Sequence, residues 1–249
     1  MPDLAPSYLA LIAAVTFIAA IIGGMGGFGT GIMLTAVLTP ILGIKAVVPI
    51  LAFAGIIINA GRFWFYRRDV TWSAVKRILP VALVCLLIGT QLYRSLPPGP
   101  LAIAIGFVVL AAVPLRRWLA SRDLRLGPAG LTAGGAAFGF LNGVASGMGI
   151  VLVSVLLGAG LSGTAVLATD ALITIVVDLA RAAIFGRMAL LTEQGLALGV
   201  LIGLVSLPGS WVASRIVKRL GKRLHIVFIE LLILLGGLSL VVNGWRNLA

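Results

Sequence analysis

The chain has 249 residues, of which 61% are hydrophobic and only 10% are charged, and its mean hydropathy is +1.18. Charged residues make up roughly a quarter of an ordinary soluble domain, so this composition excludes a soluble enzyme, a disordered chain and a fibrous repeat. The net charge is +12, and most of the positive charge lies in short segments between apolar runs. That distribution is typical of topology signals in a membrane protein rather than of a nucleic-acid-binding surface.

Ten apolar segments follow one another along the chain, and each is a candidate for a helix that crosses or enters a bilayer. A helix needs about 20 apolar residues to cross the hydrocarbon core. The second and seventh segments are short for that purpose, so we expect half-helices or steeply placed spans there. The predicted fold class is therefore an all-α polytopic membrane protein. The segments are 7–24, 28–42, 46–66, 72–94, 99–118, 128–145, 147–160, 163–186, 190–214 and 224–245.

The positive residues predict the direction in which these segments run. Three stretches, 62–77, 116–125 and 215–223, hold 14 of the 19 Lys and Arg residues. Because cytoplasmic loops carry an excess of Lys and Arg, we expect these stretches at the cytoplasmic side. An even number of crossings then places both termini on the outer side. Segments three and eight would run in opposite directions, as would four and nine, and five and ten.

The sequence also indicates an internal repeat. Two long stretches without charged residues, 4–44 and 126–169, each contain a glycine-rich break. Gly29–Leu34 in the first break lines up with Gly147–Leu152 in the second, at an offset of 118 residues. Further along, Asn59-Ala60-Gly61-Arg62 matches Asp178-Leu179-Ala180-Arg181 at nearly the same offset, 119 residues.

Two aligned motifs in oppositely directed segments predict two inverted-topology repeats. We expect a first repeat over 1–119, a cytoplasmic linker over 120–127 and a second repeat over 128–249. In transporters of this architecture the substrate site lies near the bilayer midplane, where helices are interrupted. The positive N-terminal ends of half-helices can face an anion there.

The two breaks are thus the first candidates for a substrate site. Their glycines would let the backbone approach a ligand closely, and their polar side chains would donate hydrogen bonds to it. The alternative is that the glycines only permit tight helix crossings and that the polar side chains bond to nearby backbone. The candidate residues in the breaks are Gly29, Thr30, Gly31, Asn142, Ser146, Gly147 and Gly149.

Charged residues within the apolar segments are the second candidates, because a charge inside a membrane needs a partner or a wet cavity. Asp170 and Asp178 lie on roughly one face of segment 163–186, and Arg181 is placed to pair with Asp178 along the helix. Asn59 and Arg62 occupy the positions in the first repeat that correspond to Asp178 and Arg181 in the second. We expect the two arginines and Asn59 to contact an anion and the two aspartates to serve in coupling. The alternatives are an ion pair that only fixes a helix end, and an Arg62 that extends to the inner interface.

Metal and cofactor chemistry has little support in the sequence. The chain has one cysteine, Cys85, inside an apolar run, and one histidine, His225, in a basic segment. These two residues cannot build a disulfide or a metal cluster within the chain. There is no G-x-x-x-x-G-K-[ST] motif either, so we expect no cofactor and no metal. The first ten residues lack the basic region of a signal peptide, and we expect the first apolar segment to remain in the mature protein.

Four features together carry a family resemblance: the first glycine-rich break, the Leu-Gly-Ile-Lys-Ala run at 42–46, the Arg-Arg-Asp-Val-Thr-Trp run at 67–72, and the second break with the helix after it. In these features the chain resembles the sulfite exporter TauE/SafE family over about residues 8–245. The resemblance implies a multi-pass transporter of the bacterial inner membrane that carries sulfite or organosulfonates, and the charge pattern above then places both termini in the periplasm. The family includes export and uptake, so the resemblance leaves the direction open.

We therefore expect a secondary transporter, and not an enzyme, that moves a small sulfur-containing anion by alternating access. Proton coupling is an option for its energy source. An anion channel on the same scaffold is the alternative, because channels can also carry inverted repeats. The expected partners are the small anion and the lipid bilayer, without nucleic acid, and the sequence leaves a homo-oligomer open.

Overall fold

The computed structural model describes residues 6–26, 30–121, 126–216 and 222–246. These residues form ten α-helices and one short 3-10 turn, η1. No strand occurs in the described part of the chain. The helices are α1 Pro6–Gly26, α2 Thr30–Leu42, α3 Ile44–Tyr66, α4 Trp72–Ser95, α5 Pro98–Ser121, α6 Pro128–Val144, α7 Gly149–Gly158, α8 Thr164–Arg187, α9 Glu193–Ile216 and α10 Lys222–Arg246, and η1 is Arg67–Asp69.

The ten helices coincide with the ten predicted apolar segments, and their ends differ by a few residues. The largest shifts are the start of α9, at Glu193 instead of residue 190, and the end of α5, at Ser121 instead of residue 118. Local chemistry explains the first shift. The Thr192 hydroxyl accepts a hydrogen bond from the Gly195 backbone N–H at 3.1 Å, which caps the new helix. Ala189 just before it has a φ of 56°, which no α-helix accommodates.

The bundle has an apolar surface, and its interior contains buried charged residues as well as an apolar core. Large apolar side chains on the outer face of α4 are exposed, with Val84 at 60% and Ile88 at 58% exposure. In contrast, Asn142, Asp170 and Arg181 are buried. A surface this apolar around buried charged groups suits a lipid environment, where apolar side chains need no cover and charged ones do.

Three described stretches are long and apolar enough to cross a membrane by length and composition: Ile44–Asp69, Trp72–Ser95 and Glu193–Ala213. The helix α8 has similar length, but it carries four charged residues. The helices α2 and α7 have 13 and 10 residues. At a rise of 1.5 Å per residue they extend roughly 20 Å and 15 Å, which is less than the hydrocarbon thickness of about 30 Å.

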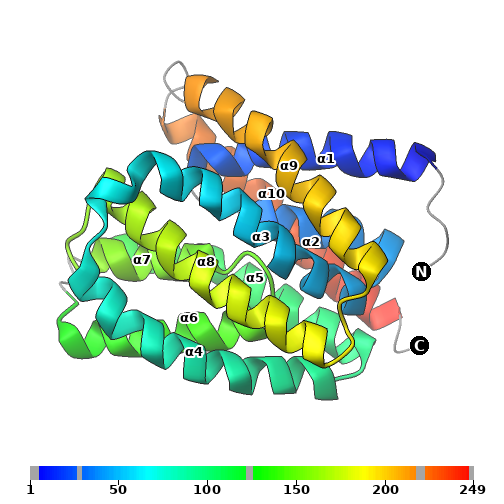
Figure 1. Ribbon diagram of the computed structural model, residues 1–249, viewed down its shortest axis with the longest axis horizontal. Helices are drawn as coiled ribbons and strands as arrows, with labels where there is room; N and C mark the ends of the chain where they lie inside the picture. Colours follow the sequence, from blue (N-terminus) through cyan, green and yellow to red (C-terminus); the bar gives the residue numbers. More distant parts are fainter. Residues whose placement is uncertain (1–5, 27–29, 122–125, 217–221, 247–249) are drawn as a thin grey trace.

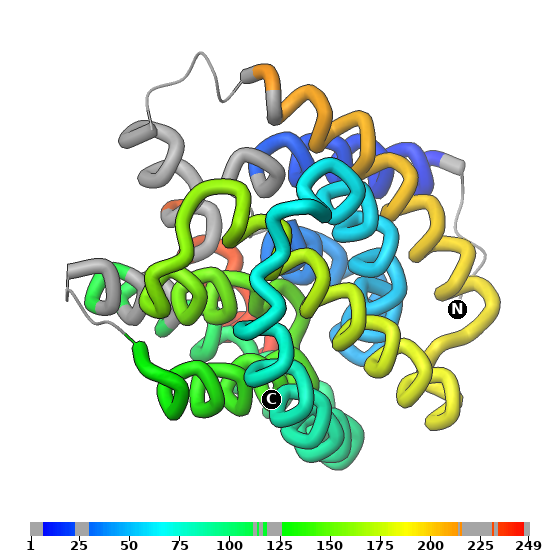
Figure 2. Tube along the Cα trace, turned by 60° about the vertical axis from the view of Figure 1, so that its left-hand side comes forward, coloured from blue at the N-terminus to red at the C-terminus, as the bar shows by residue number. Residues whose placement is uncertain are grey.

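The packing of the bundle centres on α3 and α8, which run side by side in opposite directions (Figure 1). Figure 2 shows α3 between α8 and α9. Around this centre, α4 packs along α6, α1 along α9, and α5 along α10. Glycines bring two of these pairs close together. A Cβ at Gly143 of α6 would lie 2.7 Å from the Leu86 carbonyl oxygen of α4, and one at Gly106 of α5 would lie 2.8 Å from the Gly237 carbonyl oxygen of α10. Small residues at such crossings let backbones touch, which is a common way of packing helices in membranes.

A described interruption of the helical run lies beside the cavity introduced below. Between α6 and α7, residues 145–148 are not helical, and Gly147 has a φ of +87°. Between α1 and α2, the chain passes through residues 27–29, which lie outside the described residues. The helices that follow, α2 and α7, therefore begin inside the bundle, and their first residues face the site described next.

Candidate functional site

A cavity of about 90 Å³ lies between α2, α3, α7 and α8. A volume of that size holds a few water molecules or one small anion. The structure brings eleven of the twelve predicted site residues to its walls, and the twelfth, Gly29, lies outside the described residues. The eleven are Thr30, Gly31, Asn59, Arg62, Asn142, Ser146, Gly147, Gly149, Asp170, Asp178 and Arg181. Residues far apart in the sequence thus meet at one place, and their roles there stay predictions.

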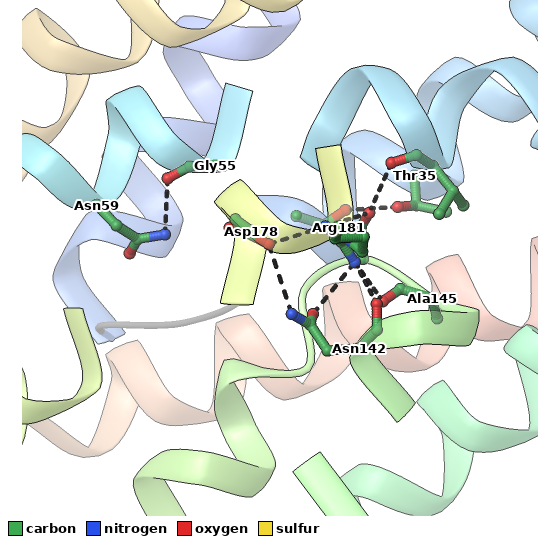
Figure 3. Close-up of polar contacts among 10 residues, drawn as sticks. Thr35, Gly55, Asn59, Asn142, Ala145, Asp178 and Arg181 are labelled. Atoms are coloured by element: carbon green, nitrogen blue, oxygen red, sulfur yellow. Dashed lines mark hydrogen bonds and ion pairs between the residues drawn. The ribbon is translucent and has the colours of Figure 1, made fainter. Parts of the chain in front are cut away.

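Arg181 from α8 is the most densely bonded of them, and its side chain is only 2% exposed (Figure 3). Its Nη1 donates hydrogen bonds to the backbone carbonyl of Asn142, to the Asn142 Oδ1 at 3.2 Å and to the Ala145 carbonyl at 3.0 Å. Its Nη2 donates to the Ser146 hydroxyl at 3.3 Å and pairs with Asp178 Oδ1 at 3.1 Å. The last carbonyls of an α-helix have no partner within the helix. Arg181 supplies partners for carbonyls at the end of α6, and so fixes the start of the α6–α7 connection.

Arg62 from α3 has a different environment. Its Nη2 lies 2.6 Å from Asp170 Oδ2 and 2.5 Å from Asn59 Oδ1. The Asn59 amide in turn donates to the Gly55 carbonyl at 2.8 Å. The Arg62 side chain is 18% exposed, whereas the Asp170 side chain is 1% exposed. Arg62 therefore points into the bundle towards Asp170 instead of extending to the inner interface.

The two arginines share one local geometry. Arg62 bonds to the residue three positions before it, Asn59, and Arg181 pairs with the residue three positions before it, Asp178. One difference is the chemistry of that residue, which is a neutral amide in α3 and a carboxylate in α8. The carboxylate that balances the Arg62 charge comes instead from Asp170, 108 residues away in the sequence. The four charged residues that line the cavity, two arginines and two aspartates, sum to zero charge.

The beginnings of α2 and α7 meet at two glycines. A Cβ at Gly31 would lie 2.8 Å from Gly147 Cα, and a Cβ at Gly147 would lie 2.5 Å from the Ile32 backbone nitrogen. The cavity is also lined by Thr30 at the start of α2 and by Gly149 at the start of α7. The first residues of two helices thus line one small space, and helix N-termini favour anions because of their dipole and their N–H groups.

The predicted hydroxyl donors have other bonds in this structure. The Thr30 hydroxyl donates to the Ala19 carbonyl at 3.5 Å, and the Ser146 hydroxyl donates to the Val48 carbonyl at 3.4 Å. Both bonds are long, so either hydroxyl can exchange its partner at small cost. Asn142 uses its amide nitrogen for Asp178 Oδ1 at 3.4 Å. These contacts agree with the alternative of local bonding as well as with a donor role.

Sequence reasoning missed Gly55, which is one of the residues around this site. Gly55 in α3 is needed beside Asp178, because a Cβ at Gly55 would collide with the Asp178 carboxylate. A glycine inside an apolar helix is a signal of close approach, but the sequence does not say to what. Thr174, one turn after Asp170 on α8, also lines the cavity. A threonine in a membrane helix usually bonds to its own backbone, so its position alone is not informative.

Comparison with known proteins agrees with this description. The model of the family "Sulfite exporter TauE/SafE" matches residues 12–240, which is nearly the whole chain. A search of curated proteins and a search of solved structures found no match. The family match runs from α1 into α10 and so includes every residue around the cavity. With apolar helices around a polar centre, the chain is a multi-pass membrane protein that belongs to the sulfite exporter TauE/SafE family of anion transporters.

Proposed function

We propose that this protein is a secondary transporter that carries a small sulfur-containing anion, sulfite or an organosulfonate, across the bacterial inner membrane by alternating access. The observation that carries this proposal is the convergence of two arginines and two helix beginnings on one small cavity. Guanidinium groups bind oxyanions through paired N–H donors, and helix N-termini add further N–H groups. The sulfur chemistry of the substrate comes from the family match and not from the geometry.

Alternating access needs two parts of the protein that move against each other around a fixed site. We propose that these parts derive from two inverted repeats, residues 1–119 and 128–249, joined by a linker over 120–127. The pairing of helices supports this. In the proposed repeat, each of the helices α1–α5 corresponds in order to one of the helices α6–α10. The packed pair α1·α9 then corresponds to the pair α6·α4, and both pairs occur in the bundle. The central pair α3·α8 and the outer pair α5·α10 each map onto themselves.

The proposed orientation places the ends of α3, α5 and α9 at the cytoplasmic side and both termini in the periplasm. The excess of Lys and Arg after these helices supports it. In the bundle, α1 begins and α10 ends at the same side (Figure 1), as an even number of crossings requires. In this orientation Arg62 lies towards the cytoplasmic end of α3, and Arg181 towards the periplasmic end of α8.

An anion channel is the second candidate, and the packing of the site argues against it. The backbones of α2 and the α6–α7 connection touch at Gly31 and Gly147, so no path runs between them at this point. An open pore needs a continuous wet path instead. A small, charge-balanced cavity beside this contact suits a carrier, in which each conformation opens the site to one side only.

The test is transport by purified protein in proteoliposomes. Sulfite, taurine, isethionate and sulfoacetate are offered one at a time, each with and without a pH gradient. A secondary transporter driven by protons accumulates its substrate inside the vesicles above the outside concentration only when the gradient is present. A channel equilibrates the anion without accumulation under an imposed pH gradient at zero membrane potential. Absence of transport of all four anions in both conditions contradicts the proposed function.

A further inference from the structure

The site contains a buried polar atom that its known contacts do not use. Asp170 Oδ2 pairs with Arg62, but Asp170 Oδ1 has no hydrogen-bond partner among the described residues. The hydroxyl oxygen of Thr174 is also buried without a partner in the described part of the chain. Asp170 and Thr174 are one helical turn apart on α8, and both line the cavity. A native buried oxygen without a partner calls for an explanation, such as a ligand or a proton that the site takes up at another stage.

A charge count indicates which ligand fits. The cavity walls carry two positive and two negative side chains and are neutral before any substrate binds. A monovalent anion would add one uncompensated negative charge to a site whose acidic groups are almost entirely buried, which is strongly unfavourable. One proton on a carboxylate restores neutrality. It also turns that carboxyl group from an acceptor into a hydrogen-bond donor.

The two aspartates differ in how readily they could take that proton. Asp178 Oδ1 contacts both Arg181 and the Asn142 amide, and Arg181 is itself bonded to the end of α6. Neutralising Asp178 would loosen the α6–α7 connection. Asp170 contacts one nitrogen of Arg62, and Arg62 keeps Asn59 as an acceptor when Asp170 leaves. Removing the Asp170 charge therefore makes one side of the Arg62 guanidinium available to a ligand. The contacts that hold the end of α6 stay in place.

Other charged groups around α8 do not change this count. Of the elements packed against α8, α3 supplies Arg62, and α7 has no charged residue. The charged residues of η1 and those at the start of α4 are exposed and are not part of the cavity wall; they are Arg67, Arg68, Asp69, Lys76 and Arg77. At the other ends of α3 and α4, Lys45 bonds to the backbone carbonyls of Tyr93 and Arg94, and the Arg94 and Arg187 side chains are exposed.

We propose that Asp170 is the proton-binding residue of the transport cycle, and that its carboxylate and the substrate anion occupy the Arg62 guanidinium in turn. In each cycle Asp170 takes one proton from water, its bond to Arg62 opens, and a monovalent anion takes the vacated donors. Release runs in reverse: the anion leaves, the carboxyl group loses its proton to water, and the ion pair with Arg62 forms again. One proton thus accompanies each monovalent anion. This inference rests on the proposed function and adds its coupling residue and its stoichiometry.

The experiment measures proton uptake when the purified protein binds isethionate. Isethionate is monovalent, and its sulfonate stays ionised near neutral pH, so any proton taken up goes to the protein. Binding is followed by calorimetry and proton uptake by a pH indicator in weakly buffered solution. We expect one proton per bound isethionate in the unmodified protein, and none in Asp170→Asn, whose neutral amide stands for the protonated acid. Glu193→Gln, which removes an exposed carboxylate outside the cavity, is the control and should keep the proton uptake.

A second measurement needs no variant and covers the case in which Asp170→Asn does not fold. The affinity of the unmodified protein for isethionate should weaken with rising pH, by up to about tenfold per pH unit, as linkage of one proton requires. Binding without proton uptake, proton uptake retained in Asp170→Asn, or a requirement for Na⁺ in place of the proton overturns the inference. So does a lack of isethionate binding. None of these results decides the proposed function, which depends separately on transport of the four anions in proteoliposomes.

Discussion

Gly31 at the start of α2 and Gly147 in the α6–α7 connection are in direct backbone contact beside the cavity, because a Cβ at Gly31 would lie 2.8 Å from Gly147 Cα. Neither position tolerates a larger side chain without a shift of backbone. Gly147 has in addition a φ of +87°, which residues other than glycine rarely adopt. The second glycine-rich break is therefore required by packing whether or not it also binds an anion.

Substitution of either glycine should consequently lower the stability of the protein. We expect Gly31→Ala and Gly147→Ala to reduce the free energy of unfolding by about 1–3 kcal/mol, from overpacking and, at Gly147, backbone strain. The measurement is the thermal unfolding midpoint in detergent without ligand. Gly186→Ala is the matched control, because a Cβ there meets nothing within 4 Å. Unchanged midpoints for both cavity variants would show that the two halves do not pack here as described.

We expect Arg181 to contribute mainly to the stability of the protein, because its contacts hold Asp178 and the end of α6. Its removal leaves the Asp178 charge and the backbone carbonyls of Asn142 and Ala145 without this donor. Breaking a buried ion pair in this way costs about 3–5 kcal/mol. We expect Arg181→Met to lower the unfolding midpoint strongly, and Arg181→Met combined with Asp178→Asn to recover part of the loss. If the double variant is no more stable than the single one, the unpaired Asp178 charge is not the cause.

Several features of the site could be predicted from the sequence because they follow from local rules. Charged residues in apolar segments are costly, so Asp170, Asp178 and Arg181 were bound to lie in a polar interior. The spacing of three between Asp178 and Arg181 also predicts their contact along one helix. The bond between Arg62 and Asp170 could not be predicted, since it depends on how α3 packs against α8. The role of Gly55 could not be predicted either, because the group that leaves no room for a Cβ at Gly55 is the carboxylate of Asp178 on α8.

Arg62 is the better candidate for direct binding of the anion. Arg62→Lys keeps the charge but loses the planar, two-pronged donor, which matches oxyanions. A hydrogen bond to a charged group contributes about 1.5–3 kcal/mol, so the affinity for the transported anion should fall by at least about tenfold. Stability should change less than in Arg181→Met, because the Arg62 side chain is partly exposed. Unchanged affinity in both Arg62→Lys and Arg62→Ala would assign Arg62 a purely structural role.

The proposed orientation can be tested by cysteine labelling. Cys85 is the only cysteine, so Cys85→Ala provides a background without thiols. Asp69 follows α3 and Ser95 ends α4, and both are exposed. In intact cells, a membrane-impermeant thiol reagent should label Ser95→Cys from the periplasm and should reach Asp69→Cys only after the membrane is permeabilised. The reverse pattern would invert the whole proposed topology.

A single added charge should weaken anion binding if the neutrality of the cavity matters. Asn59→Asp is nearly isosteric and copies the residue that stands at the equivalent place before Arg181. It puts a second carboxylate beside Arg62, where Asn59 Oδ1 already lies within 2.5 Å of Nη2, and makes the cavity negative by one charge. The new carboxylate competes with the substrate for the guanidinium and repels it, so we expect the affinity for isethionate at neutral pH to fall by at least about tenfold. Asn243→Asp on α10 makes the same chemical change away from the cavity and is the control. Equal affinities in calorimetry for Asn59→Asp and Asn243→Asp would mean that the charge of this cavity does not govern binding of the anion.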